Sequence, residues 1–257
     1  MADETVTKTE TSDTGIPAAK CSPADATTDA GMIGWLNWPG LPFVAPLTTF
    51  LVLTMLETEL KSALSYELVY TLKVLCCGFV LFLCRTAFPR WNGSGITAAI
   101  GLGVAGCVLW VVLDAVQRSL LDAVGLAAWI PERAGYQIDG TAWSLPQAAF
   151  VGVRLLGLTV IVPLAEEICW RGFLSPFLVN EDFQTVSPGH MTRGSFLIVT
   201  GVFTSLHPEI LAAFVWCSLI NLLWIRNRNL WACIAAHAST NLVLGVYVLT
   251  TGNWHLW

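Results

Sequence analysis

The chain is poor in charged residues. Lysine, arginine, aspartate and glutamate together supply only 12% of its 257 residues, against roughly 25% in ordinary soluble domains. The 13 basic residues are outnumbered by 18 acidic ones, and there is no basic run that could neutralise a phosphate backbone. The composition argues against a soluble enzyme and excludes nucleic acid as a partner.

The chain also lacks paired cysteine motifs. None of its eight cysteines has the CxxC spacing of a metal or redox site. Six of them lie inside apolar runs, where thiols behave as small hydrophobic side chains. We interpret the cysteines as packing residues rather than as a disulfide framework.

Apolar residues, by contrast, are abundant and come in long blocks. They make up 55% of the chain, and several blocks approach the ~20 residues that cross a bilayer as a helix. This pattern predicts an all-α fold, a polytopic transmembrane helical bundle of about seven helices, with eight as an alternative. The segments are roughly residues 41–56, 69–88, 96–113, 148–177, 196–206, 210–225 and 230–249.

The first 33 residues differ from the rest of the chain. Residues 1–33 are acidic and rich in Thr, Ser, Ala and Asp, so they cannot bury enough apolar surface to fold, and we expect a disordered tail. They also lack the basic start and apolar core of a cleavable signal peptide, so the first hydrophobic helix should act as the insertion signal. Residues 34–257 then form one membrane-embedded domain, with its polar motifs at about 147–251.

Basic residues are distributed unequally between the two predicted sides of the membrane. The side of the N-terminus carries five arginines in its connections, namely Arg85, Arg90, Arg193, Arg226 and Arg228. The opposite side carries Lys61, Arg118 and Arg133, diluted by six acidic residues. Because Lys and Arg resist translocation, we expect a multi-pass protein of the cell membrane with a cytoplasmic N-terminus.

The fourth apolar segment holds two adjacent carboxylates and an arginine. An ionisable side chain near the bilayer centre costs at least ~2.5 kcal/mol, so each one needs a reason. Glu167 and Arg171 are four residues apart on one helical face, which suits a supporting ion pair; a salt bridge that only fixes packing is the alternative. Glu166 points away from the face shared by Glu167 and Arg171, so its carboxylate is available for a catalytic role. Pro163 can open or kink the helix just before it.

Two later segments add imidazole and amide groups. The fifth segment ends at His207-Pro208, and the seventh carries His237 and Asn241 on one face. Counted from the predicted cytoplasmic ends, Glu166, His207 and His237 lie roughly 18, 18 and 12 Å deep. Polar groups at similar depth in an apolar protein indicate a site, although an interfacial histidine and interhelical hydrogen bonds are the simpler alternatives.

These groups fit hydrolysis by water. There is no thiol or serine partner at matching depth for a covalent mechanism. Glu166 could take a proton from water and return it to a leaving amine, while His207, His237 and Asn241 position the water and stabilise the oxyanion. A second mechanism would use a divalent metal such as zinc, held by His207 and His237. Catalytic zinc commonly has three protein ligands, and Asn is a poor one. No HExxH motif is present, so the sequence leaves the metal open.

The ordered motifs resemble those of a known family. Glu166-Glu167-x-x-x-Arg171, then Phe203-x-x-x-His207, then His237-x-x-x-Asn241 are similar to the three signatures of the CPBP family, the CAAX proteases and bacteriocin-processing enzymes also called Abi. The stretch from residue 230 to Trp254 looks more particularly like the bacterial branch of CAAX prenyl protease-related proteins, whose members accompany exosortase systems.

The resemblance implies an intramembrane endopeptidase and makes residues 34–257 its protease domain. Glu166 would be the activating carboxylate, with His207, His237 and Asn241 completing the site, and Glu167 and Arg171 would be the supporting pair. The implied partners are a membrane-anchored protein or peptide substrate and components of an exosortase-type sorting system. The family is described both as metal-dependent and as glutamate-dependent, so the resemblance leaves the metal open.

Two other functions compete with this interpretation. Buried Glu and His also mark ion pathways, so a transporter or proton relay is one alternative, although no inverted repeat is visible. An immunity or assembly factor without proteolytic activity is the other. Lys73 and Arg154 could serve either scheme; because Arg154 is near one end of its segment, we expect it to snorkel towards the membrane interface.

The charge distribution makes a testable prediction about topology. Single cysteines introduced into a Cys-free background should be labelled from outside the cell near Arg133 and Trp257, and protected near Arg90 and Arg228. Labelling near Arg228 together with protection near Arg133 would reverse the orientation.

Overall fold

The structure, a computed structural model, describes residues 37–60, 63–126, 128, 137 and 143–257. The predicted tail at residues 1–33 and the loop around Arg133 lie outside these residues. Within the described residues all regular secondary structure is helical. This confirms the predicted all-α fold class.

The helices follow the apolar segments closely. The α-helices are α1 Leu41–Leu60, α2 Tyr66–Cys84, α3 Ile96–Ala123, α4 Leu145–Leu156, α5 Val162–Cys169, α6 Ser175–Phe177, α7 Arg193–Ser205, α8 Ile210–Asn227 and α9 Leu230–Thr251. Two π-helical segments, Gly157–Ile161 and Trp170–Leu174, join α4, α5 and α6 into one rod. Each of the seven predicted segments thus coincides with one helical rod.

Five of the described helices are long and apolar enough to cross a membrane. They are Tyr66–Ala87, Ile96–Ala123, Leu145–Phe177, Ile210–Asn227 and Leu230–Thr251. The apolar stretch Leu41–Glu57 is shorter. α7 has 13 residues, which at ~1.5 Å per residue span about 20 Å, less than the ~30 Å of a hydrocarbon core. The chain is therefore a multi-pass helical membrane protein in which α7 is a short helix.

Local sequence signals set several helix ends. Ser65 and Asn229 accept hydrogen bonds from backbone N–H groups in the first turns of α2 and α9. Ser144 and Thr192 begin α4 and α7 with capping boxes. These side chains satisfy N–H groups that have no partner within the helix.

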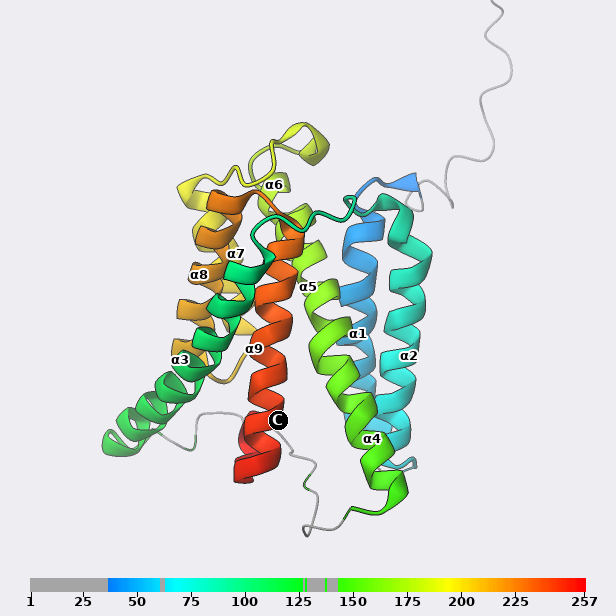
Figure 1. Ribbon diagram of the computed structural model, residues 1–257, viewed down its shortest axis with the longest axis vertical. Helices are drawn as coiled ribbons and strands as arrows, with labels where there is room; N and C mark the ends of the chain where they lie inside the picture. The colour runs from blue at the N-terminus through cyan, green and yellow to red at the C-terminus, as the bar shows by residue number, and fades with distance from the viewer. Residues whose placement is uncertain (1–36, 61–62, 127, 129–136, 138–142) are drawn as a thin grey trace, which may run out of the picture. The chain divides into compact units, whose positions relative to one another are not determined.

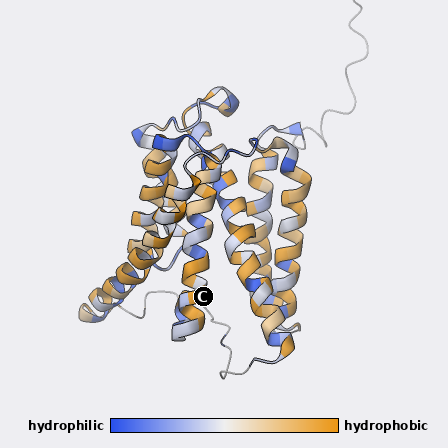
Figure 2. Ribbon diagram, in the orientation of Figure 1, coloured by the Kyte–Doolittle hydropathy of each residue, from blue (hydrophilic) through white to orange (hydrophobic). Residues whose placement is uncertain are grey.

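The outer faces of the helices are apolar. Large hydrophobic side chains are exposed along several helices, for example Leu75 on α2 and Val108 on α3, each 62% exposed. Figure 2 shows hydrophobic residues along the rods and hydrophilic residues gathered in the connections at one end of the bundle. An exposed apolar surface of this extent fits contact with lipid rather than with water.

The helices form two groups with α5 between them (Figure 1). α2 packs against α1 and α4, whereas α3, α7, α8 and α9 pack among themselves. α5 contacts both α1 and α9. The rod that carries Glu166 and Glu167 therefore faces both groups.

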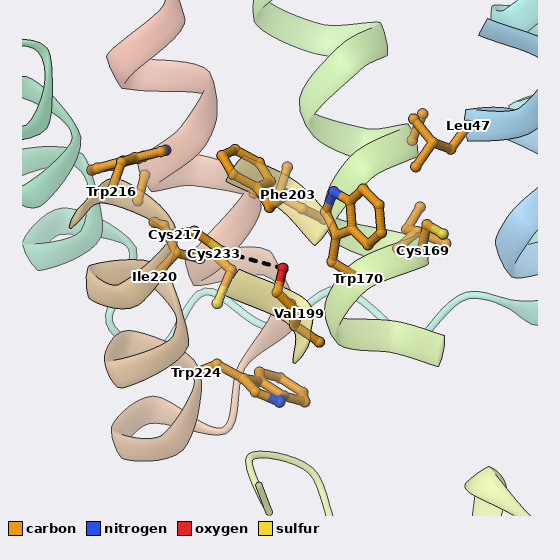
Figure 3. Close-up of a cluster of buried hydrophobic side chains, with 14 of the residues drawn as sticks. Leu47, Cys169, Trp170, Val199, Phe203, Trp216, Cys217, Ile220, Trp224 and Cys233 are labelled. Atoms are coloured by element: carbon orange, nitrogen blue, oxygen red, sulfur yellow. Dashed lines mark hydrogen bonds between the residues drawn. The ribbon is translucent and has the colours of Figure 1, made fainter. Parts of the chain in front are cut away.

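Small residues on α3 allow a close approach to its neighbours. A Cβ atom at Gly103 would lie 2.3 Å from the carbonyl oxygen of Ala236 on α9, and one at Gly106 would lie 2.1 Å from the ring of Trp216 on α8. The apolar core extends from this contact through Cys217 and Val199 to Trp170 and Phe203 (Figure 3). Close packing of α3 against α9 thus fixes the helix that bears His237 and Asn241.

Candidate active site

The π-helical segments Gly157–Ile161 and Trp170–Leu174 lie before and after the paired carboxylates. The first of them changes the hydrogen bonding of the rod. The N–H of Val162 bonds to the carbonyl of Gly157, five residues earlier, rather than to that of Leu158. Pro163 has no N–H, so it cannot donate to Leu158 either. The carbonyl of Leu158 is thus left without a partner in its own rod. π-Helical turns of this kind are frequent at functional sites.

Asn241 on α9 supplies the missing hydrogen bond. Its Nδ2 donates to the carbonyl oxygen of Leu158 at 2.9 Å. The kink that Pro163 led us to expect is therefore a π-helical shift in hydrogen bonding, and it ties α9 to the rod shortly before Glu166. Asn241 keeps a second amide hydrogen and its carbonyl oxygen for other contacts.

Glu167 lies at the centre of a buried network. It has no solvent exposure, and both of its carboxylate oxygens lie 3.0 Å from Nη1 of Arg171. Its Oε1 also lies 2.8 Å from Nδ1 of His237 on α9. The ion pair expected from the i, i+4 spacing is thus present, and the structure adds His237 as a second partner of the same carboxylate.

Arg171 connects this network to α8. Its Nε donates to Oδ1 of Asn221 at 3.2 Å, and its Nη2 lies 3.3 Å from both the carbonyl oxygen and the Sγ of Cys217. Asn221 in turn donates to the hydroxyl of Thr200 on α7 at 3.0 Å. Asn221 was not among the residues predicted from the sequence, although an amide inside an apolar segment is a detectable signal.

His207 lies just beyond the end of α7. A residue before proline disfavours helical backbone, and α7 ends two residues before His207. Nδ1 of His207 lies 2.8 Å from the carbonyl oxygen of Phe203, and the two rings stack at 4.4 Å. The ring centre of Trp110 on α3 lies 5.7 Å from that of His207, in an edge-to-face arrangement. These contacts with Phe203 and Trp110 fix the position of the imidazole.

Glu166 does not take part in the Glu167 network. It is only partly buried, and its Oε2 lies 3.5 Å from Nε1 of Trp170, a contact that the sequence spacing did not lead us to expect. The indole of Trp170 packs against Phe203 at 6.4 Å (Figure 3). The two adjacent carboxylates therefore lie in different surroundings.

One cavity brings the four candidate catalytic residues together. It measures about 1510 Å³ and is lined by Glu166, His207, His237 and Asn241, among other residues. Glu167 and Arg171 are not part of the lining. The supporting pair thus lies behind the wall that Glu166 and His237 present to the cavity.

The hydrogen bonds of the two histidines fix their orientation. A carboxylate and a carbonyl oxygen can only accept, so Nδ1 carries the proton that points to Glu167 in His237 and to Phe203 in His207. With Nδ1 as the donor, Nε2 is the ring nitrogen that accepts a hydrogen bond when it carries no proton. The geometry makes both rings suitable for orienting a water molecule.

The donor set does not fit a catalytic zinc site. Such a site commonly uses three protein ligands, and within the described part of the chain no three His, Cys, Asp or Glu side chains form a group that could hold a metal ion. His207 and His237, the two candidate ligands, therefore lack a third of these types.

Arg154, which was expected to snorkel, is instead enclosed by the protein. It is only 5% exposed and lines the cavity. The tyrosine rings of α2 and the C-terminal Trp257 surround its guanidinium. The snorkelling prediction is wrong because this end of the rod packs inside the bundle. Lys73, which the sequence analysis considered together with Arg154, pairs with Glu57 on α1 at 2.5 Å.

The buried pair predicts a specific pattern of stabilities. Glu167→Ala and Arg171→Ala should each lower the free energy of unfolding by about 3–5 kcal/mol, because each leaves a buried charge without its partner. The double replacement should cost less than the sum of the two. Thermal unfolding in detergent of the parent, both single variants and the double variant measures this, with Glu166→Gln as the milder reference. A Glu167→Ala variant as stable as the parent but wholly inactive would show that Glu167 shares the catalytic role.

The comparisons with known proteins agree with the motif order. Residues 148–243 match the model of a family described as Rce1-like, type II CAAX prenyl endopeptidase. No curated protein and no solved structure shows significant similarity to the chain. The match supports a CAAX-type intramembrane endopeptidase in general terms. All three motifs lie inside the matched residues, so the match covers the part of the chain that carries the resemblance to CAAX proteases.

Proposed function

We propose that the protein is an intramembrane endopeptidase that hydrolyses a peptide bond of a membrane-associated substrate. The observation that carries this proposal is the single cavity lined by Glu166, His207, His237 and Asn241. An acid, two imidazoles and an amide from three separate parts of the chain thus face one space. The family match over residues 148–243 supports the same reaction class.

In the proposed reaction, Glu166 acts as general base and then as general acid. Its carboxylate takes a proton from water while the water oxygen attacks the carbonyl carbon of the scissile bond. When the carbon–nitrogen bond breaks, Glu166 returns the proton to the leaving nitrogen. Glu166 suits this role because it lines the cavity, whereas Glu167 is engaged by Arg171 and His237.

The remaining groups orient the water and the developing oxyanion. Because Glu166 takes one of the two hydrogens of the attacking water, the Nε2 atom of either His207 or His237 can accept a hydrogen bond from the other hydrogen. Asn241 donates one amide hydrogen to Leu158, which holds the side chain in place and leaves the second hydrogen for the oxyanion. Donors that are already in position stabilise the transition state without further reorganisation.

The size and lining of the cavity suit a peptide segment. Pockets for drug-sized ligands measure roughly 300–1000 Å³, and this cavity is larger, at about 1510 Å³. Apolar residues such as Leu47, Phe50 and Leu244 line much of it. We therefore propose a membrane-anchored protein or peptide as substrate; an exosortase-type partner stays a prediction.

The cavity extends towards one end of the bundle. Its lining includes Glu57 near the end of α1, Tyr66 at the start of α2, Leu126 beyond α3 and Leu256 near the C-terminus. If the N-terminus is cytoplasmic, as the charge distribution predicts, this end faces outward. Substrates would then enter the cavity from the outer side of the membrane.

The proposal predicts the effect of removing the base. Glu166→Gln should lower the cleavage rate by about 100-fold or more, because an amide keeps the shape but cannot take a proton from water. Its stability in detergent should stay close to that of the parent. Cleavage is measured by mass spectrometry on a reconstituted membrane-anchored substrate, and the exposed Glu59→Gln on α1 is the matched control.

Two outcomes would contradict the proposal. Near-parental turnover by Glu166→Gln would remove the assigned base. Candidate substrates are the membrane proteins whose C-termini differ between membranes with and without the protein. If the parent cleaves none of them, a transporter or an assembly factor would be favoured.

A further inference from the structure

The turn that follows α7 has irregular backbone within the depth of the membrane. α7 has 13 residues, so it spans about 20 Å at ~1.5 Å per residue. The chain then turns back through residues 206–209 into α8 before it has crossed a ~30 Å apolar core. Irregular backbone at such depth is tolerated only where protein groups satisfy its N–H and C=O groups. The turn that carries His207 therefore needs polar partners from neighbouring helices.

Gln117 on α3 is such a partner at two points of the turn. Its Nε2 donates to the carbonyl oxygen of Pro208 at 2.8 Å, and its Oε1 accepts from the backbone N–H of Leu211 at 2.8 Å. The first N–H groups of a helix need acceptors from outside it. The side chain of Glu209, at the N-cap of α8, makes no capping hydrogen bond to the described first turn. Gln117 thus caps α8 from a position 94 residues earlier in the chain.

The same face of α3 also contacts the ring of His207. Trp110 precedes Gln117 by seven residues, which is close to two helical turns. Its ring centre lies 5.7 Å from that of His207. Nδ1 of His207 lies 2.8 Å from the carbonyl oxygen of Phe203. The imidazole is thus held by α3 and α7, and the backbone directly after it is held by Gln117.

Gln117 lies behind the cavity wall. It is only 5% exposed and does not line the cavity, whereas Trp110, His207 and Pro208 do. A substrate in the cavity therefore does not touch Gln117. Any effect of this residue on the reaction passes through the turn that it holds.

We propose that Gln117 is a positioning residue for His207. This rests on the proposed function, in which Nε2 of His207 can accept a hydrogen bond from the attacking water. Because one amide fixes both the Pro208 carbonyl and the Leu211 N–H, it sets the course of the backbone as it leaves His207, and so the place of the imidazole. A misplacement of about 1 Å at a site can lower a rate by ~100-fold. A residue that only stabilised α8 would leave the imidazole where it is.

Histidine NMR tests this without any catalysis. ¹⁵N spectra of histidine-labelled, full-length protein in lipid bilayers are compared between the parent and Gln117→Leu, which is similar in size and has no polar side-chain atom. A His207→Gln spectrum assigns the signal. We expect the His207 resonances to shift, or to split into several positions, because the ring is no longer held in one place. The His237 resonances should stay unchanged and serve as an internal reference.

Gln147→Leu is the matched control. Gln147 also supports the start of a helix, because its Oε1 accepts from the N–H and the hydroxyl of Ser144 at the start of α4. It does not line the cavity. This variant should be less stable to heat in detergent but should leave the His207 signal in place. Gln117→Asn has an amide that is one methylene shorter and cannot keep both hydrogen bonds, so it serves if Gln117→Leu does not fold.

Kinetics on a reconstituted membrane-anchored substrate complete the test. Gln117→Leu should lower kcat by about tenfold or more, because the water is no longer oriented correctly. KM should stay within about twofold of the parental value, since a residue outside the cavity lining contributes nothing to substrate binding. Gln147→Leu should keep both parameters.

The outcomes separate this inference from the proposed function. An unchanged His207 resonance in the Gln117 variants overturns the inference, and so does a parental kcat. A His207 signal that moves as far in Gln147→Leu as in Gln117→Leu also overturns it, because the effect would then follow from lost stability. Absence of cleavage by the parent removes the peptidase proposal, while the spectra still decide whether Gln117 positions His207.

Discussion

The arrangement of the site depends on the full burial of Glu167. A carboxylate without solvent exposure must be paired and hydrogen-bonded, and here Arg171 and His237 both meet that need. Arg171 extends the contact to α8 through Cys217 and Asn221. One buried charge thus fixes the relative positions of α5, α8 and α9. Glu166 lies next to it in the chain but faces the cavity, so the two acids have separate roles.

A second constraint comes from the backbone of the same rod. The π-helical hydrogen bond and Pro163 together leave the carbonyl of Leu158 free, and Asn241 satisfies it. This contact and the Glu167–His237 contact connect α9 to the rod on either side of α5's start. Irregular backbone inside a membrane is tolerated where protein groups satisfy it. The two contacts hold His237 and Asn241 against the cavity that Glu166 also lines.

Much of this was predictable from periodicity. Apolar blocks gave the helical rods, and four-residue spacings placed Glu167 with Arg171 and His237 with Asn241 on common faces. The contact between Glu167 and His237 was not predictable, because it joins residues 70 positions apart through packing of α9 that no spacing encodes. Arg154 was misjudged for a related reason: its position in the segment suggested an interface, but the neighbouring aromatic residues that enclose it come from α2 and the C-terminus.

The central claim is that Glu167 holds His237 by its Nδ1–H and so presents Nε2 to the cavity. ¹⁵N NMR of histidine-labelled protein in lipid bilayers measures this directly, with a His237→Gln spectrum to assign the signal. The account predicts a protonated Nδ1 in a strong hydrogen bond, and a clear shift of that resonance in Glu167→Ala. An Nδ1 without a proton, or a His237 signal that does not respond to Glu167→Ala, would contradict it.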